Sequence, residues 1–167
     1  MTTLNTPRLK LVLRTRRQTL EQLERLSPEQ LREVSAQWLE RVWNSTDADP
    51  WVHGFVATLR EDGTFVGQCG FKAPPDASGV VEIASGIAPG FEGRGFATEA
   101  AGELVRFALG QAGVTCVRAH TLPTNVASIR VLAKCGFQSV GEFSDPEDGL
   151  VMRFECTGPR AAAAASS

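Results

Sequence analysis

A glycine-rich turn between a strand-like segment and a helix-like segment constrains the fold of this chain more than any other feature. An apolar run ends at Ile87, Pro89-Gly90 interrupts it, and Gly93-Arg94-Gly95 follows. Over residues 97–109 the apolar positions recur with the period of a helix that buries one face. This stretch therefore predicts a unit of strand, glycine turn and helix.

The turn has properties that suit an anion. Gly93 and Gly95 lack the Cβ atoms that would keep a ligand from the backbone, and the first N–H groups of a helix have no acceptor within it. The helix macrodipole adds roughly 0.3–1 kcal/mol, and several N–H groups can share one diphosphate. From these residues alone, a tight turn that needs its glycines only for geometry is an equal alternative.

Two common nucleotide motifs do not match this turn. Walker A requires Gly-Lys followed by Ser or Thr, and the dinucleotide fingerprint requires Gly or Ala at the position of Thr98 and an acid about 20 residues further on. The segment 114–118 contains no acid. Neither type of nucleotide site is expected.

Two segments instead resemble a known family. Residues 93–100, GRGFATEA, resemble the acetyl-CoA loop of the GNAT acetyltransferases, in the form of the ribosomal-protein N-terminal acetyltransferase (RimJ/RimL-like) branch. Residues 125–137, NVASIRVLAKCGF, resemble that branch's N-x-x-S-x-x-x-L-x-K-x-G-F segment, and Thr6-Pro7-Arg8-Leu9 resembles its opening. The similarity covers residues 6–155, and two motifs in the right order are far more specific than either alone. The resemblance implies the GNAT fold, acetyl-CoA as cosubstrate and an amine acceptor.

The pattern of elements predicts one α/β domain over residues 1–157, followed by a low-complexity Ala/Ser tail at 158–167. Its order is β-α-α-β-β-β-α-β-α-β-β, a mixed and mostly antiparallel sheet of about seven strands with about four helices. The expected strands are 9–13, 53–59, 65–71, 80–87, 116–121, 137–143 and 150–155, and the expected helices are 18–26, 28–43, 97–109 and 125–135. The strand at 116–121 is expected to run parallel to the one at 80–87.

Composition and charge narrow the class of protein. The chain has 167 residues, 43% of them hydrophobic and 22% charged, with a net charge of −2, so no basic excess points to nucleic acid or to an anionic membrane. It contains no apolar run of membrane-spanning length and no secretory leader pattern, which favours a cytoplasmic protein. The four cysteines are isolated and there are only two histidines, so no metal site is expected.

The resemblance also implies which residues bind the cofactor. The diphosphate lies on the backbone N–H groups of Gly93, Arg94, Gly95, Phe96, Ala97 and Thr98, and Arg94 either pairs with it or is a solvated surface residue. The pantetheine arm pairs with the strand end at Ile87 and Ala88, whose backbone donors also polarise the thioester oxygen. Asn125 binds the pantetheine with its side-chain amide, caps the helix, or does both. Arg130 reaches the 3′-phosphate.

Ser128 and Glu82 are the candidate catalytic residues. Many members of the superfamily place a tyrosine acid where this chain has Leu132, and the chain contains no tyrosine. Ser128 is then the group left to protonate the CoA thiolate or to donate a hydrogen bond to it. Glu82 resembles the carboxylate that deprotonates the amine, either directly or through water, and an exposed strand glutamate is the competing interpretation. His120 is interpreted as a structural histidine.

The acceptor is expected to be a protein or peptide N-terminus. An α-amine of pKa about 8 loses its proton at pH 7 for roughly 1–1.4 kcal/mol, whereas a lysine costs roughly 4.6 kcal/mol, so a site with one uncertain base suits the α-amine. The alternatives are a small amine, such as an antibiotic or polyamine, and a non-catalytic acyl-CoA-binding module. In the resembled family the helices after the first strand border the acceptor, so Trp38 and Trp43 are candidates for its lining. A homodimer is possible.

Overall fold

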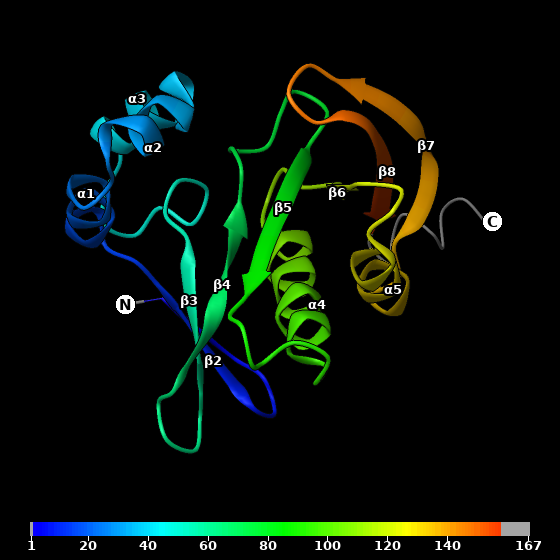
Figure 1. Ribbon diagram of the computed structural model, residues 1–167, viewed down its shortest axis with the longest axis horizontal. Coiled ribbons are helices and arrows are strands. Elements are labelled where there is room, and N and C mark those ends of the chain that lie inside the picture. Colours follow the sequence, from blue (N-terminus) through cyan, green and yellow to red (C-terminus); the bar gives the residue numbers. More distant parts are fainter. Residues whose placement is uncertain (1, 158–167) are drawn as a thin grey trace.

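The protein is described by a computed structural model that covers residues 2–157, so the Ala/Ser tail predicted at 158–167 lies outside the described residues. The described chain forms one eight-stranded sheet in the order β1-β2-β3-β4-β5-β6-β8-β7 and five helices (Figure 1). The strands are β1 (Thr3–Asn5), β2 (Leu9–Leu13), β3 (Phe55–Leu59), β4 (Phe65–Phe71), β5 (Val80–Ile87), β6 (Cys116–Thr121), β7 (Gln138–Asp145) and β8 (Gly149–Thr157). The helices are α1 (Arg16–Glu24), α2 (Pro28–Glu33), α3 (Ala36–Trp43), α4 (Phe96–Leu109) and α5 (Val126–Lys134).

The sheet is antiparallel except at its centre, as the sequence predicts. Strands β1 to β5 form a meander, β6 runs parallel to β5, and β8 returns antiparallel to β6. The register pairs β5 with β6 at three positions, Val80 to Glu82 against Cys116 to Arg118. Beyond these positions the two strands diverge, and Figure 1 shows β6 turning away from the line of β5. The centre of the sheet therefore opens at the carboxyl end of β5.

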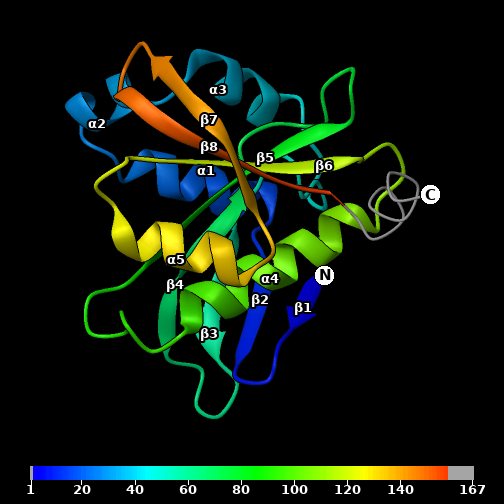
Figure 2. The same ribbon diagram turned by 90° about the vertical axis from the view of Figure 1, so that its right-hand side faces the viewer.

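Helix α4 lies against the sheet and supplies much of the core. Its apolar face buries Ala100, Ala101, Leu104 and Ala108 against β2, β4, β5 and β6. Leu104 has no exposed surface, so its burial stabilises the fold by about 2 kcal/mol. Helix α5 lies beside α4 (Figure 2), where the Cys135 thiol donates to the Thr98 carbonyl over 3.4 Å. Helices α4 and α5, which contain parts of the two motifs, are thus neighbours in space.

Two predicted elements differ from the structure. The expected helix at 28–43 is wrong as a single helix, because Val34 has the extended conformation (φ −77°, ψ 133°) and ends α2. Ser35 then begins α3 by accepting a hydrogen bond from the Trp38 N–H, so a local side-chain cap replaces continuation of the helix. The sheet also gains β1, a three-residue edge strand too short to show a periodic pattern. These two changes raise the expected numbers to eight strands and five helices.

Helices α1 to α3 gather at one end of the molecule in Figure 1. A buried histidine ties this region together: the His53 side chain is 1% exposed, with Nδ1 2.8 Å from Thr19 Oγ1 and Nε2 3.0 Å from Ser45 Oγ. The apolar side chains of these helices are not all buried, since Val42 is buried but Leu31 is 40% exposed. The helices therefore leave apolar side chains free to line a cavity.

Candidate active site

The glycine turn presents uncapped backbone N–H groups, as an anion site requires. Gly93 (φ +74°) and Gly95 (φ +84°) both have the left-handed conformation that favours glycine. Gly95 is the N-cap of α4 and offers no side-chain hydrogen bond to the first turn. A Cβ built on Gly93 would meet no atom within 4 Å, so the turn is open on that side. The residues thus fit a diphosphate bound by the helix N-terminus and the turn before it.

The opening motif of the chain fixes this turn from the side. The Thr6 hydroxyl donates to Glu99 Oε2 over 2.8 Å, and Arg8 Nε donates to Glu99 Oε1 over 3.2 Å. The Arg8 guanidinium also lies over the Phe96 ring, 4.3 Å from its centroid. The segments at residues 6–9 and 93–100, which both resemble the family, are therefore in direct contact. This contact holds the first turn of α4.

Helix α5 brings its motif to the same place. Asn125 Oδ1 accepts from the Ser128 N–H over 3.1 Å, so Asn125 caps the helix as one of its two predicted roles requires. Its side-chain NH₂ group stays available for a ligand. Ser128, Arg130 and Lys134 lie further along the helix and line the same cleft as Asn125. Arg130 and Lys134 are one helical turn apart, which places two cations on one side of the cleft.

These elements enclose a cleft with a volume of about 770 Å³. It lies between the diverging strands β5 and β6, the turn before α4, and α5. Its lining includes most of the residues predicted to bind the cofactor, namely Ile87, Gly93, Gly95, Phe96, Ala97, Thr98, Asn125, Ser128 and Arg130. Two motifs about 30 residues apart are therefore brought together around a space large enough for an extended ligand.

The free edge of β5 faces this cleft. Glu82 O accepts from the Lys72 N–H and the Ala88 N–H donates to Val66 O, so the even-numbered residues of β5 direct their backbone groups to β4. Because neighbouring residues alternate, Ser85 and Ile87 direct theirs to the other edge, where β6 has diverged. The predicted backbone contact at Ile87 is thus accessible to a ligand, whereas the N–H of Ala88 is already used.

A second cavity, of about 490 Å³, meets the first at β5. Both are lined by Ala84, Ser85 and Gly86. The second cavity, called here the acceptor cavity, is otherwise lined by residues of α1, α3 and β4 and by residues next to these elements or to β2 and α2, including Arg14, Gln22, Leu23, Leu26, Val34, Trp38, Gln68 and Cys69. Trp38 lies in this lining as predicted, with its Nε1 donating to Val52 O over 2.9 Å, while Trp43 is 66% exposed and is not among the lining residues.

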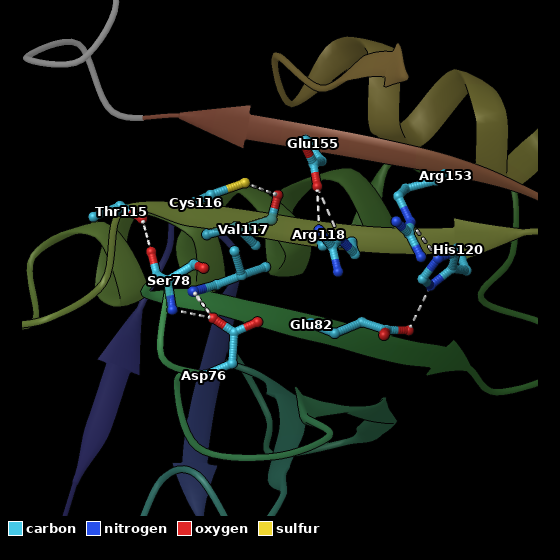
Figure 3. Close-up of polar contacts among 11 residues, drawn as sticks. Asp76, Ser78, Glu82, Thr115, Cys116, Val117, Arg118, His120, Arg153 and Glu155 are labelled. Atoms are coloured by element: carbon cyan, nitrogen blue, oxygen red, sulfur yellow. Dashed lines mark hydrogen bonds and ion pairs between the residues drawn. The ribbon is translucent and has the colours of Figure 1, made fainter. Parts of the chain in front are cut away.

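Glu82 belongs to a polar chain that reaches the cleft through His120, and Figure 3 shows Glu82, His120 and Arg153 in line. Its Oε2 lies 2.8 Å from Lys72 Nζ and 3.0 Å from His120 Nδ1. Arg153 Nε donates to His120 Nε2 over 3.0 Å, so Nε2 is an acceptor and Nδ1 carries the proton donated to Glu82. Burial acts to raise the pKa of Glu82, but the hydrogen bonds from His120 and Lys72 and the charge of Lys72 outweigh it and lower that pKa. The carboxylate is therefore ionised at neutral pH.

Three of the predicted site residues lie apart from the cleft lining. Glu82 does not line either cavity, whereas its partner His120 lines the cleft. Arg94 lies over the Phe91 ring, 5.5 Å from its centroid, and with Ala88 it is absent from the cleft lining in the described chain. The sequence argument missed Lys134, whose signal was its spacing from Arg130. It also missed Ser85 and Arg14, which no motif marks.

Comparison with known proteins identifies the family. The sequence model described as the acetyltransferase (GNAT) domain matches residues 8–138. An uncharacterised N-acetyltransferase, p20 of Bacillus licheniformis, is 27% identical over 104 residues, which are 62% of this chain and 58% of that protein. The chain thus spans little more than half the length of this curated relative. The chain belongs to the GNAT acetyltransferase family.

Solved structures show the same fold. RimL, a ribosomal L7/L12 α-N-protein acetyltransferase crystallised with coenzyme A, has a TM-score of 0.71 at 13% identity, with 93% of this chain and 98% of that chain covered. The aminoglycoside acetyltransferase AAC(6')-Ib, also with coenzyme A, has a TM-score of 0.67 at 22% identity, with 95% of this chain and 99% of that chain covered. The mixed sheet and its helices are therefore a GNAT fold, and the similar structures include enzymes of both acceptor classes.

Proposed function

We propose that the protein transfers an acetyl group from acetyl-CoA to the α-amine of a protein or peptide N-terminus. The observation that carries this proposal is the meeting of two cavities at Ala84 to Gly86 of β5. One has the uncapped helix N-terminus and the paired cations suited to CoA phosphates, and the other is open to an acceptor. A thioester paired with the free edge of β5 would lie where the two ligands meet.

The same geometry supports direct attack by the amine. Cys69 lines the acceptor cavity, and burial raises the pKa of its thiol to about 12, although the charge of Arg14 opposes this. A thiol with that pKa is protonated at neutral pH, and the thiolate is the nucleophilic form. Cys69 is thus a poor carrier of the acetyl group, and a ternary complex needs no covalent intermediate.

Ser128 is the proposed partner of the departing CoA thiolate. It lies in the first turn of α5 and lines the cleft. Leu132, at the position of the family's tyrosine acid, is 6% exposed and supplies no polar group. Donation of a hydrogen bond from the Ser128 hydroxyl to the sulfur would stabilise the thiolate as the C–S bond breaks.

Glu82 is proposed to act through water rather than by touching the amine. Its ionised carboxylate holds His120 with the proton on Nδ1, at the point where β5 and β6 separate. The proton released by the amine passes through water to the Glu82 carboxylate, because both ring nitrogens of His120 are engaged by Glu82 and Arg153. An α-amine gives up its proton for only about 1–1.4 kcal/mol at pH 7, so this arrangement suits it better than it suits a lysine.

The experiment that tests this function mixes the protein with acetyl-CoA and panels of N-terminal peptides, lysine peptides with blocked N-termini, and small amines, and follows release of free thiol. We expect release with the N-terminal peptides and a product acetylated at the α-amine by mass spectrometry. Release with aminoglycosides or polyamines alone would assign a small-molecule acetyltransferase. A raised melting temperature with acetyl-CoA but no release on any panel would assign an acyl-CoA-binding module. The cytoplasmic location and the homodimer stay predictions.

Within residues 2–157, no helix is both long enough and apolar enough to cross a membrane.

A further inference from the structure

We propose that the acceptor cavity selects an amine whose molecule also carries a carboxylate close to the reacting nitrogen, and that Arg14 binds this carboxylate. This inference rests on the proposed function, because it assumes that the acceptor enters this cavity. The shared chemistry has two sources, a free amino acid or an acidic residue next to a peptide N-terminus.

The acceptor cavity has a positive charge that no carboxylate of its lining neutralises. Arg14 is the one charged side chain among its lining residues, and none of those residues is an aspartate or a glutamate. Within the described chain, no carboxylate lies within ion-pair distance of Arg14. Cys69, in the same lining, is a neutral thiol and supplies no counter-charge. A half-buried guanidinium thus faces the cavity without a protein anion.

The hydrogen bonds of Arg14 leave room for a ligand. Arg14 Nη2 donates to Gln68 Oε1 over 2.7 Å, and this is the one side-chain hydrogen bond that Arg14 makes in the described residues. A guanidinium has five N–H donors in a planar fork that matches a carboxylate. Gln68 therefore fixes the orientation of the fork and leaves most of its donors for the acceptor.

The register of the sheet limits how far the carboxylate lies from the amine. Gln68, which binds Arg14, is paired with Gly86 on β5. Paired residues on antiparallel strands are about 4.5–5.5 Å apart at Cα. Gly86 belongs to the segment where the two cavities meet. The guanidinium is thus anchored one strand away from the reaction point, which suits a carboxylate on the reacting residue or on the one after it.

The rest of the lining disfavours an acceptor with several positive charges. Leu23, Leu26, Val34 and Trp38 form an apolar wall that can cover an aliphatic part of the acceptor. A polyamine or an aminoglycoside would bring several ammonium groups next to Arg14 without a carboxylate to receive them, and like charges placed together disfavour binding. The cavity therefore suits an acidic acceptor and not a polycation.

The test compares matched acceptors on the wild type and on variants. One series consists of hexapeptides that begin with Ser and differ only at the second residue, which is Asp, Asn or Lys. The other consists of leucine, leucinamide, spermidine and kanamycin. The variants are Arg14→Gln, Arg14→Lys and, as a matched control, Arg17→Gln, whose side chain is 87% exposed and pairs with Glu21 instead. Acetyl-CoA binding, measured by thermal shift, shows that each variant is folded.

We expect kcat/KM for the Asp peptide to exceed that for the Lys peptide by about tenfold or more, as for a charged hydrogen bond. Arg14→Gln should reduce this ratio to about one, Arg14→Lys should retain part of it because the charge remains, and Arg17→Gln should leave it unchanged. Equal rates for the three peptides, or a ratio that survives in Arg14→Gln, would overturn the inference while the proposed function stands. Acetylation of leucine but not of leucinamide or any peptide would support the role of Arg14 and overturn the peptide acceptor. Preference for spermidine or kanamycin, or no turnover of any acceptor, would overturn both.

Discussion

The two cavities of this protein are built in different ways. The cofactor cleft is lined largely by two contiguous motifs, the turn that leads into α4 and the first turns of α5, and it offers mainly backbone N–H groups and two cations. The acceptor cavity is lined by single side chains from α1, α3 and β4 and from loops, with Arg14 just beyond β2 and Val34 just beyond α2. The first cavity has the features of a phosphate site made by the backbone, and the second is the one we propose for the acceptor.

This difference explains why one cavity is visible in the sequence. Backbone recognition requires glycines, a helix N-terminus and a cap at fixed spacing, and such requirements leave a continuous signature. Recognition by side chains from distant segments leaves none. The family resemblance therefore predicts the cofactor side, and the structure is needed for the acceptor side.

The largest effect should follow from Gly95→Val. Valine at φ +84° is strained, so we expect the turn before α4 to change conformation, while the Arg8 guanidinium, 3.2 Å from the new Cβ, can shift aside. We expect acetyl-CoA affinity to fall by more than about 100-fold, measured by isothermal titration calorimetry. The matched control is Gly63→Val, which imposes similar strain at φ +77° in the hairpin between β3 and β4. Equal loss of affinity in both variants would show that general destabilisation, and not the turn, is responsible.

Ser128→Ala should affect turnover and not cofactor binding. The alanine keeps the backbone N–H that Asn125 caps, while the hydroxyl proposed to bind the thiolate is lost. We expect kcat to fall by about 10- to 100-fold, with acetyl-CoA affinity nearly unchanged. Ser139→Ala, on the exposed strand β7, should behave as wild type. Unchanged kcat in Ser128→Ala would remove this residue from the mechanism.

Trp38→Phe should affect the acceptor cavity alone. It removes the hydrogen bond from Nε1 to Val52 O and part of the apolar wall. We expect KM for the peptide to rise by about tenfold and KM for acetyl-CoA to stay constant in steady-state assays. Trp43→Phe, on the same helix but 66% exposed, is the control. A rise in the KM for acetyl-CoA would contradict the proposal that the two cavities bind different ligands.

The smallest effect concerns Glu82 and pH. Since its folded-state pKa is lowered, Glu82 stabilises the fold above its unfolded-state pKa, and this stabilisation is lost as the pH falls through the folded-state value. Glu82→Gln should thus be less stable than wild type by about 1 kcal/mol at pH 7, and the difference should shrink below about pH 4. Thermal melts at pH 7, 5 and 3.5 measure this, with Glu61→Gln in the exposed hairpin as control. A constant difference across this range would mean that the ion pair does not stabilise the fold.

Much of the fold follows from local sequence patterns. Short local signals mark the ends of elements in the structure: the Asp62-Gly63 turn, the capping box of Ser27 with Gln30, and Gly136 at φ +88° after α5. The single helix expected at 28–43 fails because Ser35, with helix-like spacing around it, is a stronger N-cap than an interior residue. Strand β1 was missed because three edge residues have too few positions to show alternation.

The sequence points to those residues of the candidate site that lie within one motif, whereas contacts between distant segments need the structure. Asn125 and Ser128 follow from one motif, and both line the cleft. The catalytic role of Glu82 stays a prediction, and its contact with His120 depends on the register of β5 against β6, which no single segment reveals. Arg14 lines its cavity because Gln68, 54 residues away, holds it there. Such contacts are consequences of tertiary structure.

The most direct test is an initial-rate study in which acetyl-CoA and an acidic N-terminal peptide are varied together. If both cavities are filled at once and the amine attacks the thioester at β5, double-reciprocal plots intersect, and intact-mass measurement finds no acetylated enzyme when acetyl-CoA is supplied alone. Parallel lines with a stable acetyl-enzyme would mean that the acetyl group passes through a residue of the protein. That result would contradict direct attack by an amine in one cavity on a thioester held in the other.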